Sequence, residues 1–200
     1  MPNIAKVITS AGKYLISPAS RRIPIRILPH YNKWLKNPEI PDFGKWQFDP
    51  GMRFNDADPW WKFGVPRKEL HNGIDLFRYL SREGCSKDVP IGTKIVNIYD
   101  GEIAKVTPDF IRSSVFVKHD IFSGNLQFYT IFGHIKIAEG LKEKDIIKSG
   151  ILLGEIAGIP AGSGALPHLH LSMAWLPKDI APCFLNWRDL GENFFINPLF

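Results

Sequence analysis

Residues 114–132 read SVFVKHDIFSGNLQFYTIF, and this stretch decides the fold class. Segments 114–119 and 126–132 are rich in β-branched and aromatic residues that favour extended backbone. Between them, residues 122–125 (Phe-Ser-Gly-Asn) have the composition of a tight turn. Two such segments joined by a short turn predict a β-hairpin.

Further strands are expected on both sides of this hairpin. Residues 93–99 and 102–107 flank an Asp-Gly dipeptide at 100–101, which is typical of a type I′ turn and predicts a second hairpin. Residues 151–157 and 168–175 each predict another short strand. Short strands separated by turn signals predict an all-β fold, with antiparallel sheets in a sandwich or half-barrel. The tail at 182–190 is expected to hold one or two helical turns.

The first 65 residues differ from the rest in composition. Residues 18–66 are crowded with proline, which excludes long helices and central strands, and with aromatic residues that a plain linker does not need. Residues 1–38 carry seven of the 25 basic side chains and none of the 20 acidic ones, so the net charge of +5 belongs to this part. We predict a basic, irregular arm over residues 1–65, packed on a domain formed by residues 66–200.

The arm leaves the partner and the compartment open. Its charge suits an anionic surface such as a cell wall, lipid headgroups or nucleic acid, but a solvated leader has the same composition. No recognised nucleic-acid fold accompanies it, so no nucleic-acid partner is expected. No stretch is apolar enough for a transmembrane segment, and polar residues interrupt 7–16 too often for a recognisable signal peptide.

Two histidine-containing segments are candidates for chemistry. The pair His168 and His170 lies in an apolar segment, where alternate residues of a strand point to the same face about 6.6 Å apart. Their imidazoles can therefore converge on one pocket. Neutral imidazole is a good ligand for a borderline ion such as zinc.

The second segment, His71-Asn-Gly-Ile-Asp75, needs a particular backbone to bring its ends together. In a straight strand His71 and Asp75 would lie roughly 13 Å apart, too far to share an ion. A helix would make them neighbours, but Gly73 in its middle costs about 1 kcal/mol relative to alanine. A bend at Asn72-Gly73 is the remaining solution, and the missing Cβ of Gly73 would leave room for a ligand.

Five short motifs occur in an order that resembles the lysostaphin/LytM-type zinc metallopeptidases, which cut peptide crosslinks of bacterial peptidoglycan. The resemblance spans roughly residues 66–200. The motifs are His71-x-Gly-Ile-Asp75, Asp100-Gly101-Glu-Ile, Phe132-Gly-His134-Ile, Gly150-Ile-Leu-Leu-Gly154 and Gly164-Ala-Leu-Pro-His168-Leu-His170. It implies one catalytic zinc per chain, a peptidoglycan or peptide substrate, and a location in the cell envelope or outside the cell.

The resemblance also implies a role for each site residue. It makes His71, Asp75 and His170 the metal ligands, and it makes His134 and His168 the catalytic residues that handle protons and stabilise the attacked carbonyl. Phe132 departs from the family, which often has tyrosine there, and this puts one hydrogen bond in doubt. Three protein ligands leave an open position on zinc for water, whose pKa falls toward about 7.

The sequence thus predicts a zinc metallo-endopeptidase. One alternative is a cell-envelope binding or scaffold module that keeps zinc but is catalytically silent or occluded. Another is a zinc hydrolase with a cytoplasmic substrate. For occlusion, a residue of segment 20–62 would cover the cleft, with Asn32, Asn37 and Asn55 as candidates, and deletion of residues 1–60 would raise activity.

The remaining candidates receive structural interpretations. His119, at a strand end, is expected to be structural. Cys85 and Cys183 form no C-x-x-C pair and are expected to be buried or incidental thiols. Three tryptophans could stack on sugar rings, but packing in the core or arm is the simpler expectation: Trp60, Trp61 and Trp175.

Overall fold

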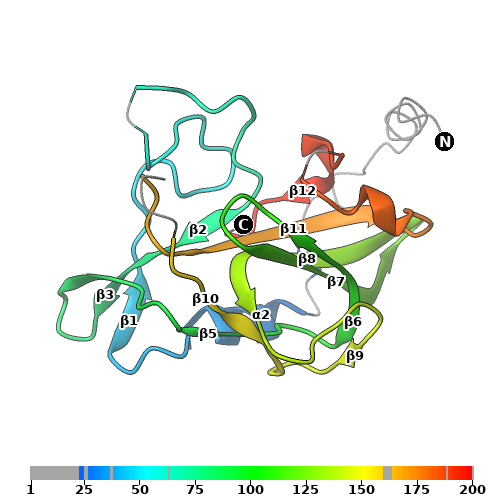
Figure 1. Ribbon diagram of the computed structural model, residues 1–200, viewed down its shortest axis with the longest axis horizontal. Coiled ribbons are helices and arrows are strands. Elements are labelled where there is room, and N and C mark those ends of the chain that lie inside the picture. Colours follow the sequence, from blue (N-terminus) through cyan, green and yellow to red (C-terminus); the bar gives the residue numbers. More distant parts are fainter. Residues whose placement is uncertain are drawn as a thin grey trace.

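The computed structural model describes residues 23–24, 27–36, 38–62, 64–159, 164–187 and 189–199 (Figure 1). Most of the described elements are strands. They are α2 (Leu28–Lys36), β1 (Phe43–Trp46), β2 (Ile74–Leu76), β3 (Arg78–Ser81), β4 (Ser86–Asp88), β5 (Lys94–Val96), β6 (Gly101–Pro108), β7 (Ser113–Ser123), β8 (Leu126–Ile137), β9 (Ile146–Ile147), β10 (Leu152–Ile156), β11 (Leu169–Pro177), the 3₁₀ helices η3 (Pro182–Phe184) and η4 (Glu192–Phe194), and β12 (Phe195–Ile196). The only described helix longer than one turn, α2, has nine residues, so no described helix could cross a membrane.

The strands form two antiparallel sheets, which confirms the predicted all-β class. The main sheet has nine strands and runs β12-β11-β8-β7-β6-β9, with β2 paired to β11, β10 paired to β8, and β5 paired to β10. The second sheet, β1-β3-β4, is small. The longest strands, β7, β8 and β11, lie side by side through the centre of the molecule (Figure 1).

The hairpin at 114–132 is present, whereas the hairpin predicted around Asp100-Gly101 is wrong. β7 and β8 pair through Ser123 and Leu126, with a two-residue turn at Gly124 and Asn125. By contrast, β5 pairs with β10, and β6 pairs with β7 and β9. Neither residue of the dipeptide has the positive φ that a type I′ turn requires.

Contacts explain why the Asp-Gly pair does not form that turn. The Asp100 carboxylate accepts hydrogen bonds from Ser149 N and Lys148 Nζ, so it ties this corner to a distant segment. Gly101 lies against β7, where a Cβ would collide with the carbonyl oxygen of Lys118. The glycine is therefore needed for close strand approach rather than for a turn.

The other strand predictions are confirmed, with β10 and β11 where residues 151–157 and 168–175 suggested them. Among the described residues of the predicted tail at 182–190, one short helix forms, η3, and η4 follows the tail. Both cysteines, Cys85 and Cys183, are exposed free thiols rather than buried ones.

The N-terminal part is more regular than its composition suggested. Helix α2 carries Pro29 in its first turn, where no backbone N–H is needed, and it ends before Pro38. Strand β1 pairs with β3 at the edge of the small sheet. Trp34 donates its indole N–H to the carbonyl oxygen of Val96 at 2.9 Å, so α2 is fixed on the main sheet. The boundary at residue 65 stays a prediction.

Both faces of the main sheet are covered, and this sets the place of the site. Along β11, Leu169, Leu171 and Met173 pack into the larger core, while Ala174 and Leu176 pack into a smaller cluster on the opposite face. Because side chains alternate along a strand, the even-numbered residues of β11 share the face of the smaller cluster. The candidate histidine of β11 therefore lies on that face.

Candidate metal centre and cleft

The bend predicted between His71 and Asp75 is present, and Gly73 makes it possible. The backbone bends at Gly73 and then enters β2, which pairs with β11 so that Asp75 lies opposite His170. A Cβ on Gly73 would lie 2.5 Å from the carbonyl oxygen of Leu171. The space beside this glycine is thus filled by β11 and is not free for a ligand.

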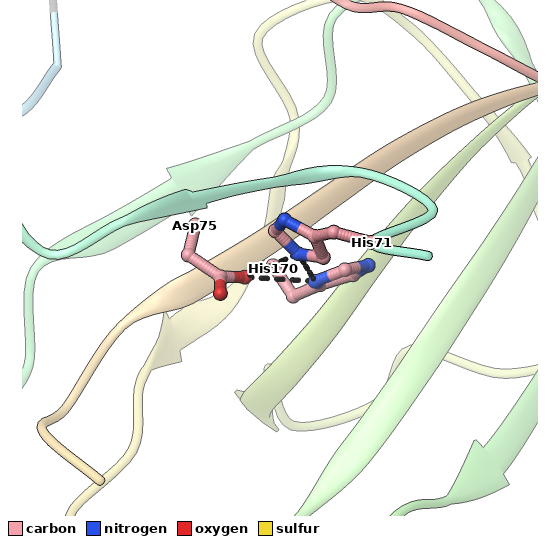
Figure 2. Close-up of side chains that lie close together, drawn as sticks. All are labelled: His71, Asp75 and His170. Carbon is pink, nitrogen blue, oxygen red and sulfur yellow. Dashed lines mark hydrogen bonds and ion pairs between the residues drawn. The ribbon is translucent and has the colours of Figure 1, made fainter. Parts of the chain in front are cut away.

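Figure 2 shows that the side chains of His71, Asp75 and His170 point toward one another. Nε2 of His71 lies 3.2 Å from Oδ1 of Asp75 and 3.2 Å from Nδ1 of His170. Nδ1 of His170 lies 2.8 Å from the same carboxylate oxygen. Ligands on a tetrahedral zinc are about 3.3 Å apart, so these three atoms need to separate by only a few tenths of an ångström. In the described part of the chain, this is the only cluster of its kind.

Each imidazole of the cluster is held from its far side. Nδ1 of His71 lies 2.9 Å from the carbonyl oxygen of Arg53, which can only accept, so this nitrogen carries the proton. Nε2 of His71 is then left with a free lone pair. In His170 the opposite nitrogen, Nε2, lies 2.9 Å from the Ser172 hydroxyl, and Nδ1 faces the cluster. Partners of this kind fix the orientation and tautomer of metal-binding histidines.

The carboxylate of Asp75 is held in the same manner. Trp60 donates its indole N–H to Oδ2 at 2.7 Å, and Nη2 of Arg67 lies 3.7 Å from that oxygen. Burial alone would raise the pKa of Asp75, but its electrostatic interaction with His71 and its hydrogen bond with His170 outweigh burial and hold the pKa well below its usual value. Burial lowers the pKa of His170 to about 4. An ionised carboxylate and a neutral imidazole are the forms that bind metal.

His168 approaches the cluster without joining it. It precedes β11, and its Nδ1 donates to the carbonyl oxygen of Leu166 at 2.7 Å. Its Nε2 lies 3.8 Å from Oδ1 of Asp75. Burial lowers the pKa of His168, although the nearby Asp75 opposes this. The imidazole is therefore directed at the cluster with an unprotonated nitrogen.

His134 also faces the metal-ligand cluster, from the point in β8 where the strand changes its pairing partner. Up to Gly133 the strand pairs with β11, and from Ile135 onward it pairs with β10. His134 stands between these two pairings with a φ of +67°, which is rare for a residue other than glycine. Its ring centroid lies 4.8 Å from that of His168 and 5.7 Å from that of His170. All five predicted site residues are thus brought together.

The fold is shared with a solved peptidase domain. The catalytic domain of the antimicrobial peptidase lysostaphin from Staphylococcus simulans matches 84% of this chain and 93% of its own length, with a TM-score of 0.50 and 16% identity. The chain has the lysostaphin catalytic-domain fold. The resemblance drawn from the five motifs is confirmed at this level.

Two longer solved chains also match. A zinc containing peptidase from Vibrio cholerae matches over 82% of this chain and 38% of its own length, with 15% identity and a TM-score of 0.49. A structure of the antimicrobial peptidase lysostaphin from Staphylococcus simulans matches over 83% of this chain and 50% of its own length, with 18% identity and a TM-score of 0.49. The chain thus spans half or less of these two proteins. No protein-family model and no curated protein matches the sequence.

In this lysostaphin-type fold the five residues line a cleft of about 1130 Å³. Of the proposed covering residues, Asn32 and Asn55 do not line it, and Asn37 lies outside the described residues. The N-terminal part contributes Trp61, whose ring stacks under the guanidinium of Arg67 at 4.4 Å. The other walls include Leu70, Phe110, Trp187 and Asp189.

Structural roles predicted for two other residues are confirmed. His119 is buried, with Nδ1 2.9 Å from the carbonyl oxygen of Asp100 and Nε2 2.9 Å from the Thr130 hydroxyl. Trp175 is buried and packs on Phe128. Neither lines the cleft.

Sequence reasoning missed two residues that contact the site. Packing was the simpler expectation for Trp60, with stacking on sugar rings as the alternative, whereas its indole N–H is bound to Asp75. Asp109 was not singled out, although its carboxylate lies 3.2 Å from Nδ1 of His134. A Pro-Asp pair after a strand was the one local signal for Asp109, and it indicates a turn rather than a site.

Proposed function

We propose that this chain is a zinc metallo-endopeptidase that hydrolyses peptide bonds in peptidoglycan crosslinks. The observation that carries the proposal is the set of three buried ligand atoms within 3.2 Å of one another, with two further imidazoles directed at the same cleft. A purely structural metal site has no use for the additional pair. The shared fold with an antimicrobial peptidase domain supports the same choice.

Zinc would be held by Nε2 of His71, Oδ1 of Asp75 and Nδ1 of His170, one ion per chain. When bound, it lowers the pKa of a coordinated water toward about 7 and polarises the carbonyl of the scissile bond. Two nitrogen ligands and one carboxylate match the donor preference of this ion.

The two remaining histidines supply the groups that hydrolysis needs. His168 keeps Nδ1–H on the Leu166 carbonyl, so Nε2 is free to accept a proton from the attacking water and to return it to the leaving amine. His134 turns Nδ1 toward Asp109, which leaves Nε2 in the cleft with a lone pair. This nitrogen can take up a proton and then, as an N–H group, donate a hydrogen bond to the oxygen of the attacked carbonyl. The two neighbouring imidazoles thus fill separate roles beside the proposed ligand set.

The substrate and the compartment follow from the motif resemblance. Peptide crosslinks of a bacterial wall are the substrate class that it implies, and they place the protein in the cell envelope or outside the cell. The cleft walls carry both apolar and charged side chains, among them Leu70, Phe110 and Asp189, as a peptide substrate requires.

Digestion of purified peptidoglycan, with the released muropeptides identified by mass spectrometry, tests the proposal. We expect cleavage within the stem or bridge peptides, loss of activity with a chelator, and recovery when zinc is returned. His119→Gln is the matched control, because this buried histidine lies away from the cleft, and it should retain activity.

Other results would favour the alternatives. Stoichiometric zinc without release from any wall type would support a silent envelope module. Cleavage of small peptides without cleavage of peptidoglycan would support a hydrolase with another substrate.

A further inference from the structure

Asp109 is a buried carboxylate at the edge of the cleft with more partners than a turn requires. It lies in the loop between β6 and β7, and only 1% of its side chain is exposed. Oδ1 accepts hydrogen bonds from the backbone N–H groups of Ile111 and Arg112 at 2.8 and 2.7 Å. Oδ2 accepts one from the Ser114 hydroxyl at 2.7 Å. Three contacts thus fix this carboxylate without any help from His134.

The same Oδ2 atom also faces His134 twice. The backbone N–H of His134 donates to it at 2.9 Å, and the ring atom Nδ1 lies 3.2 Å from it. The first contact satisfies an N–H that falls between the two strand pairings of β8. The second contact has an ion-pair distance but lacks hydrogen-bond alignment, and no other described residue is a hydrogen-bond partner of Nδ1. Such contacts are often loosely aligned in a catalytic site without its substrate.

The backbone of His134 makes the first contact important. A positive φ at a non-glycine residue is strained and persists only where neighbouring groups enforce it. An irregularity of this kind in a strand re-aims one side chain. Here it directs the His134 ring across the cleft toward His168 and His170.

We propose that Asp109 is the positioning residue of His134, holding its backbone in the left-handed conformation and its ring with Nδ1–H toward the carboxylate. This deepens the proposed function, because it determines which nitrogen of His134 faces substrate. Burial raises the pKa of Asp109, but hydrogen bonds from His134 and from backbone N–H groups outweigh it and keep the carboxyl ionised.

The hydrogen bonds of Asp109 extend to Trp187, another residue that lines the cleft. Trp187 donates its indole N–H to the Ser114 hydroxyl at 2.8 Å, and that hydroxyl donates to Asp109. The Trp187 ring packs edge-on against His170, with centroids 5.1 Å apart. One line of hydrogen bonds therefore connects the wall beside a metal ligand to the residue that aims His134.

Asp109→Asn tests the proposal because it keeps the shape of the side chain but puts an NH₂ donor in place of Oδ2, the atom that accepts from Ser114 and faces His134 twice. The two turn bonds can remain on the amide oxygen, but an NH₂ group then faces the His134 N–H and donates to Nδ1 of the ring. His134 should switch from the Nδ1–H to the Nε2–H tautomer. Nitrogen-15 NMR of the imidazole rings in zinc-free protein at pH 8 reads this directly and does not depend on peptidase activity.

The zinc-loaded variant supplies a second readout. We expect zinc content and KM to be unchanged and kcat to fall about 10²–10⁴-fold, the scale for a misdirected acid–base group. Asp145→Asn is the matched control, because Asp145 also accepts a turn N–H, from Lys142, but does not line the cleft. The Asp145→Asn variant should keep the Nδ1–H tautomer of His134 and the kcat of the wild-type chain.

Two results would overturn the proposal. One is an unchanged His134 tautomer or an unchanged kcat in Asp109→Asn. The other needs no variant: an Nε2–H tautomer of His134 in the zinc-free wild-type chain contradicts it, even if the variant fails to fold. If the tautomer switches but the wild-type chain cleaves no peptide, the positioning role stands and the peptidase assignment fails.

Discussion

His119 on β7 and His170 on β11 are both buried in the main sheet, and burial lowers the pKa of each to about 4. Their partners differ. Both nitrogens of His119 meet uncharged groups, a carbonyl and a hydroxyl. His170 gives one nitrogen to a hydroxyl and turns the other toward a carboxylate and a second imidazole. Burial and a shifted pKa are therefore shared by structural and functional histidines, and the convergence of other ligand atoms separates them.

The largest effect should come from His170→Ala. We expect zinc content to fall from one ion per chain to near zero, with a lower melting temperature, because metal binding contributes to the free energy of folding. His119→Gln should keep its zinc. Metal analysis of the two purified variants checks this, and loss of zinc from His119→Gln alone would reverse the comparison.

His168→Ala should have the next largest effect, on rate rather than on metal. Its Nε2 is directed at the cluster but lies 3.8 Å from Asp75, outside the ligand set. We expect near-stoichiometric zinc and a kcat lower by about 10²–10⁴-fold. Zinc analysis beside a peptide turnover assay decides the point. A variant that loses zinc would make His168 the ligand and His170 the proton carrier.

Trp60→Phe should have an intermediate effect on the metal. It keeps the aromatic ring but removes the N–H bound to Oδ2 of Asp75, and losing such a partner weakens metal affinity about 10–100-fold. Competition with a chelator measures the change, and Trp61→Phe is the control. The same contact reverses the expectation that deleting residues 1–60 raises activity, because the deletion removes Trp60. Zinc affinity in that truncated chain should fall as well.

The smallest effect should be the pH dependence due to His119. Its pKa is lower in the folded chain than in the unfolded one, so the unfolded chain binds more protons between about pH 6.5 and 4. The contribution of His119 to the free energy of unfolding is fully present above that window, and it is lost as the pH falls through the window. From pH 6.5 to 5, the zinc-free wild-type chain should lose about 2 kcal/mol more than His119→Gln. Urea denaturation of both proteins measures this, and parallel curves would contradict it.

The sequence predicted the parts of this molecule that depend on neighbouring residues. The β-branched and aromatic segments and the turn composition of residues 122–125 predicted the β7–β8 hairpin, and the spacing of His168 and His170 placed both on one face. The bend at Gly73 followed from excluding a straight strand and a helix. Each of these inferences required only a few consecutive residues.

The parts that depend on distant contacts were missed. The Asp100-Gly101 pair has the composition of a hairpin turn, but its polar groups bind residues 148 and 149. Trp60 is separated from Asp75 by 15 residues and Asp109 from His134 by 25, without a regular period that would connect them. Only tertiary packing shows that they meet.

The pairing of β2 with β11 has a consequence for the order of folding. Asp75 and His170 are 95 residues apart, a larger separation than in the other described strand pairs of the main sheet. The entropy of closing a loop grows with its length, so contacts between distant residues form late. The β7–β8 hairpin can form early, but the ligand set is assembled only when this last loop closes. A nascent or stalled chain would therefore have no assembled ligand set, and the proposed hydrolysis would begin only in a molecule that has finished folding.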